Sequence, residues 1–238
     1  MIKKYRLGLR AVLVAFCVVA AVFAAGCGKP TESKTPASGR GGYSVVDATK
    51  TRIDFTYKPQ RIVSLGLSAD EVLLDMVEPE RIAALTYLAD DAGISPAAAK
   101  AERVKGRVQS GSLESVLAQQ PDLVLVPDWT DLNFVELLRG AKVPVYVYKT
   151  PTTVKEIKQT ICELANVVDE RVAGGKIVAK MEKELAFVQA RVGNMPAEEC
   201  ISVMALSYMG PFGARGTTFA DICNYANVRN VVAEYDLP

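Results

Sequence analysis

The sequence contains no histidine among its 238 residues. Ser-His-Asp and Cys-His catalysis both need an imidazole as general base, so enzymes of those classes are excluded. Catalytic zinc sites built on histidine are excluded for the same reason. No pair of acidic residues has a spacing that indicates catalysis by carboxylates alone. We therefore predict a protein that is not an enzyme, with no catalytic residues, no metal site and no cofactor.

The net charge is also small, because 28 lysine and arginine residues stand against 27 aspartate and glutamate residues, which gives +1. A field that attracts nucleic acid over a distance needs a large basic excess. We therefore expect no nucleic-acid partner.

The first residues have the pattern of an export signal. Basic residues occur between residues 3 and 10, and residues 11–26 form a run without charge. A membrane-spanning helix needs roughly 20 apolar residues. A shorter run behind a basic start is typical of a secretory signal peptide. We predict a signal peptide over residues 1–26.

The motif AAGC at residues 24–27 resembles the bacterial lipobox, in which the cysteine is acylated and becomes the new N-terminus. An ordinary signal peptide with an incidental cysteine is the alternative. Residues 28–42 contain almost nothing apolar, so they cannot offset their ordering entropy and should form a flexible linker. We predict lipidation at Cys27 and a tether over residues 27–42. The protein would then be lipid-anchored in the cell envelope, at the outer face of the cytoplasmic membrane or in the periplasm.

Three of the five cysteines lie beyond this tether, namely Cys162, Cys200 and Cys223. An odd number outside the cytoplasm predicts either a free thiol or a partner that this chain does not contain. The sequence leaves the redox state of the three open.

Residues 43–150 alternate short apolar strands with helices. A hairpin is expected over residues 43–55, where two β-prone runs flank a polar turn. Further strands are expected at residues 61–65, 81–85, 123–126 and 143–148, with a short extended piece from Val104. Helices are expected from Ala69 with Ser68 as N-cap, over 97–102, over 112–119 with Ser112 as N-cap, and over 131–139. This alternation predicts one α/β lobe with a parallel sheet covered on both faces.

Residues 151–196 are predicted to be helical. Apolar residues recur at helical spacing from Val154 to Leu164. A second helix of about 24 residues should follow Asp169, a candidate cap, and would be about 36 Å long. A βα crossover needs no such length, so this helix is predicted to bridge to a second lobe.

Residues 197–238 begin that second, partial α/β unit. A strand is expected over residues 200–208, then a glycine-rich loop and a short helix over 218–225. This strand has no neighbour left in the sequence. We therefore expect residues 200–238 to stay loose, with unpaired edges along strand 201–206, while residues 43–150 fold alone.

Four stretches carry a resemblance to a known family. They are RIVSLGLSADEVLLDM at residues 61–76, SLESVLAQQPDLVLVPDW at 112–129, VPVYVYKTPTTVKEI at 143–157 and TTFADICNYANVRNVV at 217–232. Together they resemble the iron-complex and cobalamin class of ABC-transporter substrate-binding proteins. Their order and spacing match this class over nearly all of residues 43–238.

The resemblance implies a two-lobed α/β periplasmic-binding-protein fold whose lobes are joined by one long helix. It implies a ferric siderophore (an iron-siderophore complex), haem or cobalamin held between the lobes and delivered to an ABC permease dimer in the cytoplasmic membrane. Which of these ligands is bound stays open. Family members continue for another lobe, so a second lobe that is incomplete in this chain, as in a fragment or a truncated frame, is expected. An envelope lipoprotein with an enzymatic or scaffolding role and a non-functional fragment are the alternatives.

Ligands of open α/β sheets lie beyond the carboxyl ends of the strands. This rule selects the loops that follow the expected strands, and the candidate ligand-binding residues in them are Leu67, Ser68, Tyr87, Asp128, Trp129, Tyr208, Phe212 and Arg215. Trp129 and Tyr87 would offer stiff contact area to a flat macrocycle or an aromatic chelator. Arg215 could pair with carboxylate or catecholate oxygens. The alternatives are aromatic rings folded onto the lobe and a solvated arginine.

Glu114 lies in the first turn of the helix expected over residues 112–119, where the helix dipole favours a carboxylate. The helical pattern turns Leu113, Val116 and Leu117 toward the sheet, so Glu114 should face water. The resemblance implies that the acid of this block docks onto an arginine of the permease. It also implies a twin acid in the second lobe for the other permease subunit. A charge that only stabilises the helix start is the alternative.

Overall fold

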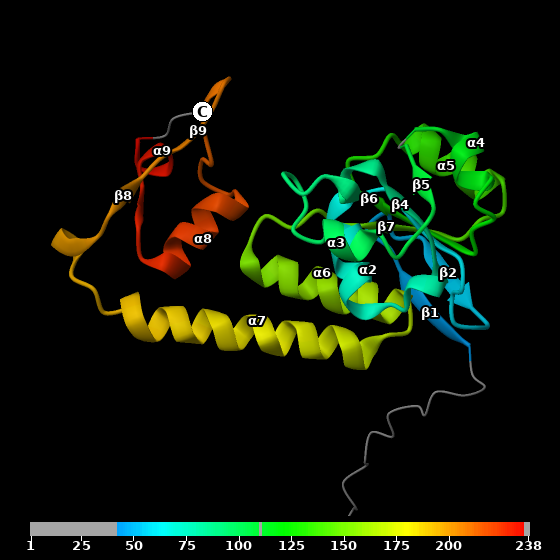
Figure 1. Cartoon of the computed structure of the whole chain (residues 1–238), viewed down its shortest axis with the longest axis horizontal. Coiled ribbons are helices and arrows are strands. Elements are labelled where there is room, and N and C mark those ends of the chain that lie inside the picture. Colours follow the sequence, from blue (N-terminus) through cyan, green and yellow to red (C-terminus); the bar gives the residue numbers. More distant parts are fainter. Residues whose placement is uncertain (1–41, 110, 236–238) are drawn as a thin grey trace, which may run out of the picture. The chain divides into compact units, whose positions relative to one another are not determined.

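The computed structural model describes residues 42–109 and 111–235 (Figure 1). The predicted signal peptide, Cys27 and residues 27–41 of the predicted tether lie outside the described residues. No helix within the described residues is long and apolar enough to cross a membrane.

A five-stranded parallel sheet lies at the centre, with the strand order β5-β4-β3-β6-β7. Its strands are β3 (Ile62–Ser64), β4 (Ile82–Thr86), β5 (Arg107–Val108), β6 (Leu123–Pro127) and β7 (Val145–Tyr148). Every residue of β6 and β7 is buried, as their unbroken apolar runs predict for strands covered on both faces. The expected parallel sheet is thus confirmed.

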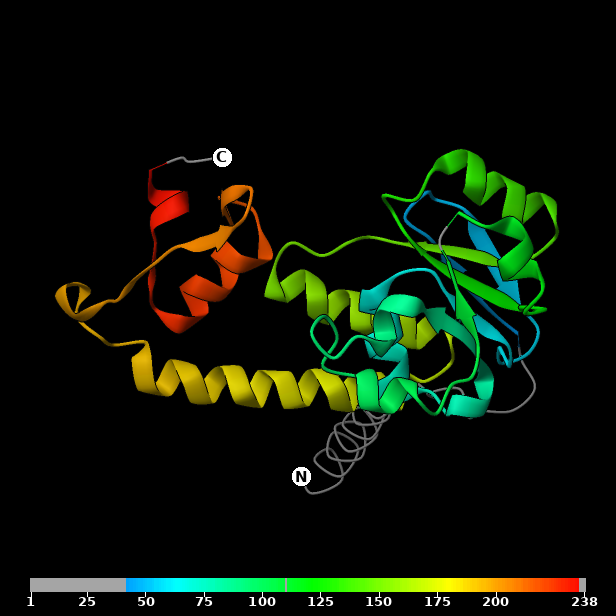
Figure 2. The ribbon, with the colours of Figure 1, turned by 45° about the horizontal axis from the view of Figure 1, so that its top comes forward.

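Helices cover both faces of this sheet. One face carries α2 (Leu67–Met76) and α6 (Val154–Val167), and the other carries α4 (Leu113–Leu117) and α5 (Leu132–Gly140). In Figure 2, α4 and α5 are green and α6 is yellow-green, on opposite sides of the strands. The short elements are η1 (Pro79–Arg81), η2 (Tyr87–Asp90) and α3 (Ala98–Ala101).

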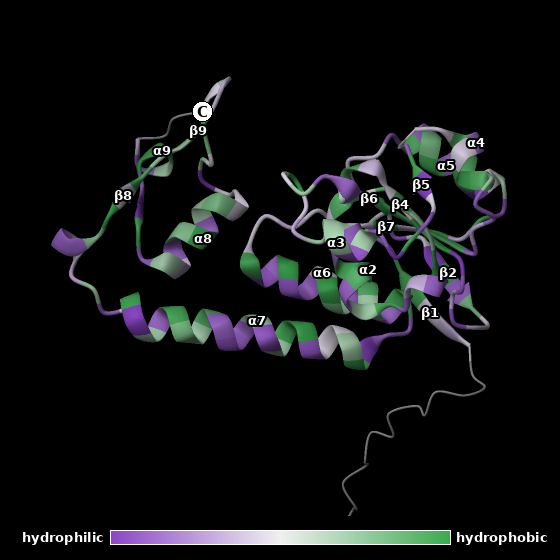
Figure 3. Ribbon diagram, in the orientation of Figure 1, coloured by the Kyte–Doolittle hydropathy of each residue, from purple (hydrophilic) through white to green (hydrophobic). Residues whose placement is uncertain are grey.

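The alternation of strand side chains explains the two layers, because successive residues point to opposite faces. Leu125 of β6 packs in the α2/α6 layer, whereas its neighbours Val124 and Val126 pack in the α4/α5 layer. Figure 3 shows the strands largely in the green of hydrophobic residues. The sheet is therefore held by two apolar cores rather than one.

Two of the three predicted helix caps are wrong. Ser112 does cap α4, because its hydroxyl accepts a hydrogen bond from the amide of Ser115 at 3.3 Å. Ser68 does not cap α2, because this helix begins at Leu67, two residues earlier than predicted, and Gly66 takes the N-cap position in an extended conformation. Asp169 does not cap the next long helix either, because it has a left-handed φ of 55° and Glu170 takes the N-cap position.

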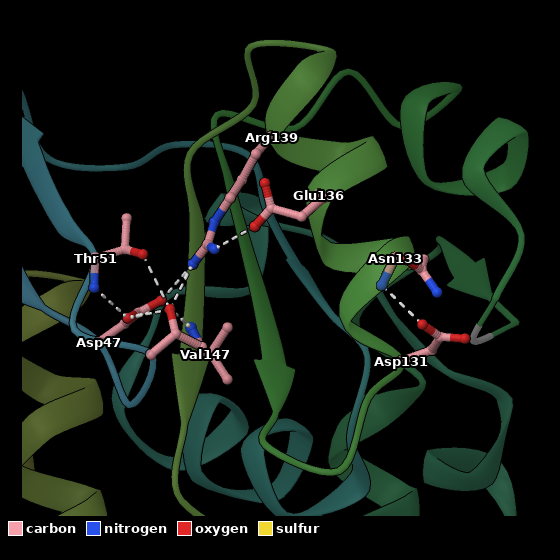
Figure 4. A network of polar contacts seen from close by, with 8 residues as sticks. Asp47, Thr51, Asp131, Asn133, Glu136, Arg139 and Val147 are labelled. Carbon is pink, nitrogen blue, oxygen red and sulfur yellow. Dashed lines mark hydrogen bonds and ion pairs between the residues drawn. The ribbon is translucent and has the colours of Figure 1, made fainter.

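The hairpin β1 (Tyr43–Val46) and β2 (Arg52–Phe55) is antiparallel, as expected. Its turn docks against the free edge of β7 through Asp47, whose side chain is fully buried. The Asp47 carboxylate accepts hydrogen bonds from Nη2 of Arg139 at 2.7 Å, the amide of Thr51 at 2.9 Å and the amide of Val147 at 3.3 Å (Figure 4). The turn thus satisfies the backbone amide and carbonyl groups of Val147 on the edge strand β7, which would otherwise be unpaired.

The predicted long helix is present as α7 (Arg171–Val192), with 22 residues, about 33 Å at 1.5 Å per residue. Gly174 is its only buried residue. A Cβ at Gly174 would collide with Cβ of Ala165, so this glycine lets α7 approach α6 closely. The rest of α7 alternates purple and green residues in Figure 3 and is mostly exposed.

The segment after α7 is more paired than predicted. Its elements are η3 (Ala197–Glu199), β8 (Ser202–Val203), β9 (Ala205–Ser207), β10 (Gly210–Phe212), α8 (Thr218–Ala226), β11 (Arg229–Asn230) and α9 (Val231–Glu234). β8 pairs in parallel with β11, and β9 forms an antiparallel hairpin with β10. The expectation of an unpartnered strand over 201–206 is therefore wrong, because the chain returns beside β8 after α8.

Candidate binding site

All five strands of the central sheet are parallel, so their carboxyl ends meet at one edge, called here the carboxyl edge. The structure places five of the predicted ligand-binding residues there. Leu67 and Ser68 follow β3, Tyr87 follows β4, and Asp128 and Trp129 follow β6. Because β3 lies between β4 and β6, the three segments that carry them follow one another along this edge. They are the start of α2, the start of η2 and the loop after β6.

The two aromatic side chains at the carboxyl edge are open to solvent. Tyr87 is 59% exposed and Trp129 is 66% exposed. Large aromatic groups gain most from burial, so two exposed rings at one edge leave apolar area free for a ligand. The alternative, in which both rings fold onto the lobe, is not observed.

Tyr148, the last residue of β7, forms a hydrogen bond with Ser68 through their hydroxyl groups. The two hydroxyl oxygens are 3.1 Å apart, and the tyrosine is 1% exposed. Burial raises the pKa of Tyr148 to about 12, so the hydroxyl stays neutral. Gly66 lies so close to this hydroxyl that any Cβ there would collide with it. Sequence reasoning missed Tyr148, because it reads as one more apolar residue of a buried strand.

Asp70 ties the first turn of α2 to the end of β4. The residue is 0% exposed, and its Oδ2 accepts hydrogen bonds from Oγ1 of Thr86 at 2.6 Å and from the amide of Thr86 at 3.1 Å. Burial raises the pKa of Asp70 to about 6 against the opposing effect of the nearby Ser64 and Thr86 hydroxyls. Sequence reasoning gave Asp70 no role, because an acid in the first turn of a helix is ordinarily explained by the helix dipole.

Asp128 joins the loops after β6 and β7. Its Oδ1 accepts hydrogen bonds from Oγ1 of Thr150 at 2.7 Å and from the amide of Thr150 at 3.1 Å. The side chain therefore fixes the loop that carries Trp129. Asp128 remains exposed, so this role does not remove it from the edge.

A hollow of about 390 Å³ adjoins Tyr87 and is also lined by Arg107, Val108 and Gln109. Arg107 donates to the carboxylate of Asp90, at 2.8 Å from Nε and 2.5 Å from Nη2. Sequence reasoning missed Arg107 and Gln109, because β5 has only two residues and its carboxyl end carries no clear signal.

The sequence profile of the family described as periplasmic binding protein matches residues 62–236. The chain belongs to the periplasmic binding protein family. This membership implies an extracytoplasmic location. The predicted fold class, the α/β fold of two-lobed periplasmic binding proteins, is confirmed.

Two curated relatives of this periplasmic binding protein are distant in sequence. The "Vitamin B12-binding protein" of Vibrio parahaemolyticus is 28% identical over 133 residues, which are 56% of this chain and 46% of the relative. The "Cobalamin-binding protein" of Halobacterium salinarum is 24% identical over 147 residues, which are 60% of this chain and 38% of the relative. The chain thus spans less than half the length of these relatives.

Two solved structures show the same fold. The molybdate-binding protein MolA of Haemophilus influenzae has a TM-score of 0.68 at 18% identity, over 81% of this chain and 66% of that chain. The haem-binding protein RhuT of Roseiflexus sp. RS-1 has a TM-score of 0.61 at 21% identity, over 74% of this chain and 67% of that chain.

Of the three candidates in the second unit of this periplasmic binding protein, Phe212 and Arg215 make contacts within that unit and Tyr208 is exposed. Tyr208 is 99% exposed in the β9–β10 turn, and the rings of Phe212 and Phe219 are 6.2 Å apart. Arg215 donates from Nε to the carbonyl oxygen of Ala233 at 2.8 Å. Their convergence with Tyr87 and the other carboxyl-edge residues stays a prediction.

Glu114 lies where the helical pattern predicts. It is exposed in the first turn of α4, while Val116 is fully buried and Leu113 packs partly against the same core. Its carboxylate is therefore free to meet another protein, although the permease contact itself stays a prediction.

Acidic and sulfur groups do not gather into a metal centre in the described part of the chain, where no three His, Cys, Asp or Glu residues lie close enough to hold an ion. Cys162, Cys200 and Cys223 have free thiols there.

Proposed function

We propose that this periplasmic binding protein captures cobalamin, haem or a ferric siderophore at the carboxyl edge and presents it to an ABC permease. The observation that carries the proposal is the pair of exposed rings, Tyr87 and Trp129, which follow β4 and β6 on either side of β3 at that edge. Leu67, Ser68 and Asp128 would complete the first lobe's contacts. Tyr208, Phe212 and Arg215 would add contacts from the second unit.

Cobalamin is the first ligand to test. Both curated relatives named above are described as binding it, and a corrin ring presents a large, mostly apolar face. Exposed tyrosine and tryptophan rings suit such a face, because they offer stiff apolar area together with a polar tip. Haem and catecholate siderophores share this flat or aromatic character, so they belong to the same test.

The proposed setting is the outer face of a membrane. A lipid on Cys27 would anchor the chain, residues 27–42 would act as the tether, and residues 1–26 would be the signal peptide. The N-terminal lobe would span residues 43–150, the helical segment with the bridging helix 151–196, and a partial second lobe 197–238. Glu114 would then meet an arginine of the permease. An exposed ion pair contributes only about 0–1 kcal/mol, but it sets orientation and encounter rate.

Binding rather than catalysis is favoured by the composition. A chain without histidine lacks the usual general base. In addition, two carboxylates at the carboxyl edge accept hydrogen bonds that hold the fold together. Asp70 is bonded to Thr86, and Asp128 is bonded to Thr150.

Equilibrium dialysis of the full chain against cyanocobalamin, haemin and a ferric catecholate siderophore tests the proposal. We expect saturable binding of one class and a loss of affinity of at least tenfold in Tyr87→Ala. Tyr57→Ala is the matched control, because Tyr57 is also 59% exposed but precedes β3 and so lies at the opposite end of the strands. Absence of saturable binding for all three classes, or equal effects of the two variants, would contradict the proposal.

A further inference from the structure

The short helix η2, which begins with Tyr87, is held at both ends. At its start, Thr86 is bonded to the buried carboxylate of Asp70 through both its amide and its hydroxyl. At its end, Asp90 pairs with Arg107. The Asp90 carboxylate is half exposed, whereas Asp70 is completely buried. The two attachments therefore differ in their surroundings, and only the first lies in the apolar interior.

We propose that Asp70 is a positioning residue, whose ionised carboxylate holds Thr86 and so fixes Tyr87 at the carboxyl edge. Protonation of Asp70 would weaken this attachment and loosen the loop. The consequence for ligand capture rests on the function proposed above, but the attachment itself does not.

The hydrogen bonds to Asp70 depend on its charge. Hydrogen bonds to an ionised acceptor are roughly twice as strong as those between neutral groups. Oδ2 accepts both bonds from Thr86, while Oδ1 is buried and has no partner in the structure. A proton added to this carboxyl group has an oxygen free to receive it, and its arrival removes the charge that strengthens both bonds.

The groups around Asp70 leave it as the residue that titrates near neutral pH. Burial raises its pKa to about 6, and the nearby Arg107 guanidinium opposes this rise. Across the sheet, Tyr148 of β7 has a pKa raised to about 12, and Asp90 of η2 has a pKa lowered by Arg107. Tyr148 and Asp90 therefore keep their charge states between pH 5 and 7.5, and the chain contains no histidine that could titrate in this range.

Helix α7 also packs on α2, but its charges face another part of that helix. Lys176 and Lys180 line a hollow together with Asp75 and Glu170. Asp75 follows Asp70 by five residues on α2, which turns it about 140° away around the helix axis. These lysines therefore do not supply a counter-charge to Asp70.

Acidification should have opposite effects on the whole fold and on the loop. Protonation removes the cost of a buried charge, so the fold as a whole becomes more stable. The same protonation weakens the bonds to Thr86, so this amide becomes less protected. A carboxylate with only a general structural role would move both quantities in the same direction.

Amide hydrogen exchange on the full chain at pH 5 and pH 7.5, corrected for intrinsic rates, measures this difference. Leu85 is the internal reference, because it precedes Thr86 on β4 and its amide donates to the carbonyl oxygen of Gly106 at 3.2 Å. We expect the protection of Thr86 relative to Leu85 to fall about tenfold at pH 5. In Asp70→Asn the ratio should be low and independent of pH. Glu71→Gln, one residue along α2, is the matched control and should behave as the unaltered chain.

A ratio that does not change with pH in the unaltered chain would overturn the proposal, and this comparison needs no variant to fold. Dialysis against cyanocobalamin then adds the functional result. We expect affinity to fall several-fold from pH 7.5 to pH 5 in the unaltered chain and to be pH-independent in Asp70→Asn. A chain that binds no cyanocobalamin would count against the proposed ligand, while the exchange ratio still decides the role of Asp70.

Discussion

Replacement of Asp70 by asparagine should flatten the pH dependence of folding stability. The pKa of Asp70 is about 6 in the folded chain against an ordinary value of 3.8, so the folded chain binds the proton more tightly. The stability that this proton contributes is fully present below pH 3.8 and is lost as the pH rises through 6. A shift of one pKa unit corresponds to 1.36 kcal/mol, so the loss between pH 4 and pH 8 should be about 2–3 kcal/mol.

Urea unfolding at pH 4, 6 and 8, followed by circular dichroism, measures this effect. The free energy of unfolding of the unaltered chain, minus that of Asp70→Asn, should decrease by about 2–3 kcal/mol from pH 4 to pH 8. Other carboxylates titrate in both proteins, so their contributions cancel in the difference. A difference that stays constant across this range, or that increases with pH, would refute the assignment of a charged, desolvated carboxylate to Asp70.

Two further predictions concern residues far from Asp70. Asp47→Ala should lower the free energy of unfolding by about 2–4 kcal/mol, because it leaves the amides of Thr51 and Val147 without their acceptor, while Arg139 keeps its ion pair with Glu136; a loss below 1 kcal/mol in urea unfolding would contradict the described network. Glu114→Arg should leave cyanocobalamin affinity unchanged and reduce uptake in cells that carry the cognate permease, whereas Glu80→Arg, an exposed control in η1, should leave both unchanged. Normal uptake by Glu114→Arg would reduce Glu114 to a charge at the helix start.

The elements with strong local patterns were predicted well from the sequence. The apolar run at residues 123–126 became β6, which extends one residue further to Pro127. The helical spacing after Val154 became α6, and α7 ended within a few residues of its expected length. Ser112 capped α4 as predicted, because a cap depends on residues only three positions apart.

Features that depend on residues distant in the sequence were not predicted. The first turn of α2 is set by Gly66 beside the Tyr148 hydroxyl, 82 positions later, rather than by Ser68. The pairing of β8 with β11 joins residues 27 positions apart, such as Ser202 and Arg229, and each strand has only two residues. Two-residue strands carry no periodicity, so no local pattern could have revealed this pair.

In the candidate site, too, positions set by local pattern were predicted, whereas contacts between distant residues were not. The loop positions of Tyr87 and Trp129 followed from the rule that ligands lie beyond the carboxyl ends of strands. The hydrogen bond between Asp70 of α2 and Thr86 of β4 joins two residues that are 16 positions apart in the sequence. It could not be inferred, because a first-turn aspartate is most often exposed and interacts with the helix dipole.

Trp129 offers the most direct test of binding at the carboxyl edge, because it is the only tryptophan of the chain. Its fluorescence can be followed while cyanocobalamin is added to the full chain, with free N-acetyltryptophanamide as the correction for light absorbed by the ligand. Binding at the carboxyl edge predicts saturable quenching with one ligand per chain and weaker binding by Trp129→Ala in dialysis. Ligand bound in dialysis with unchanged Trp129 emission, and with equal affinity in Trp129→Ala, would contradict it.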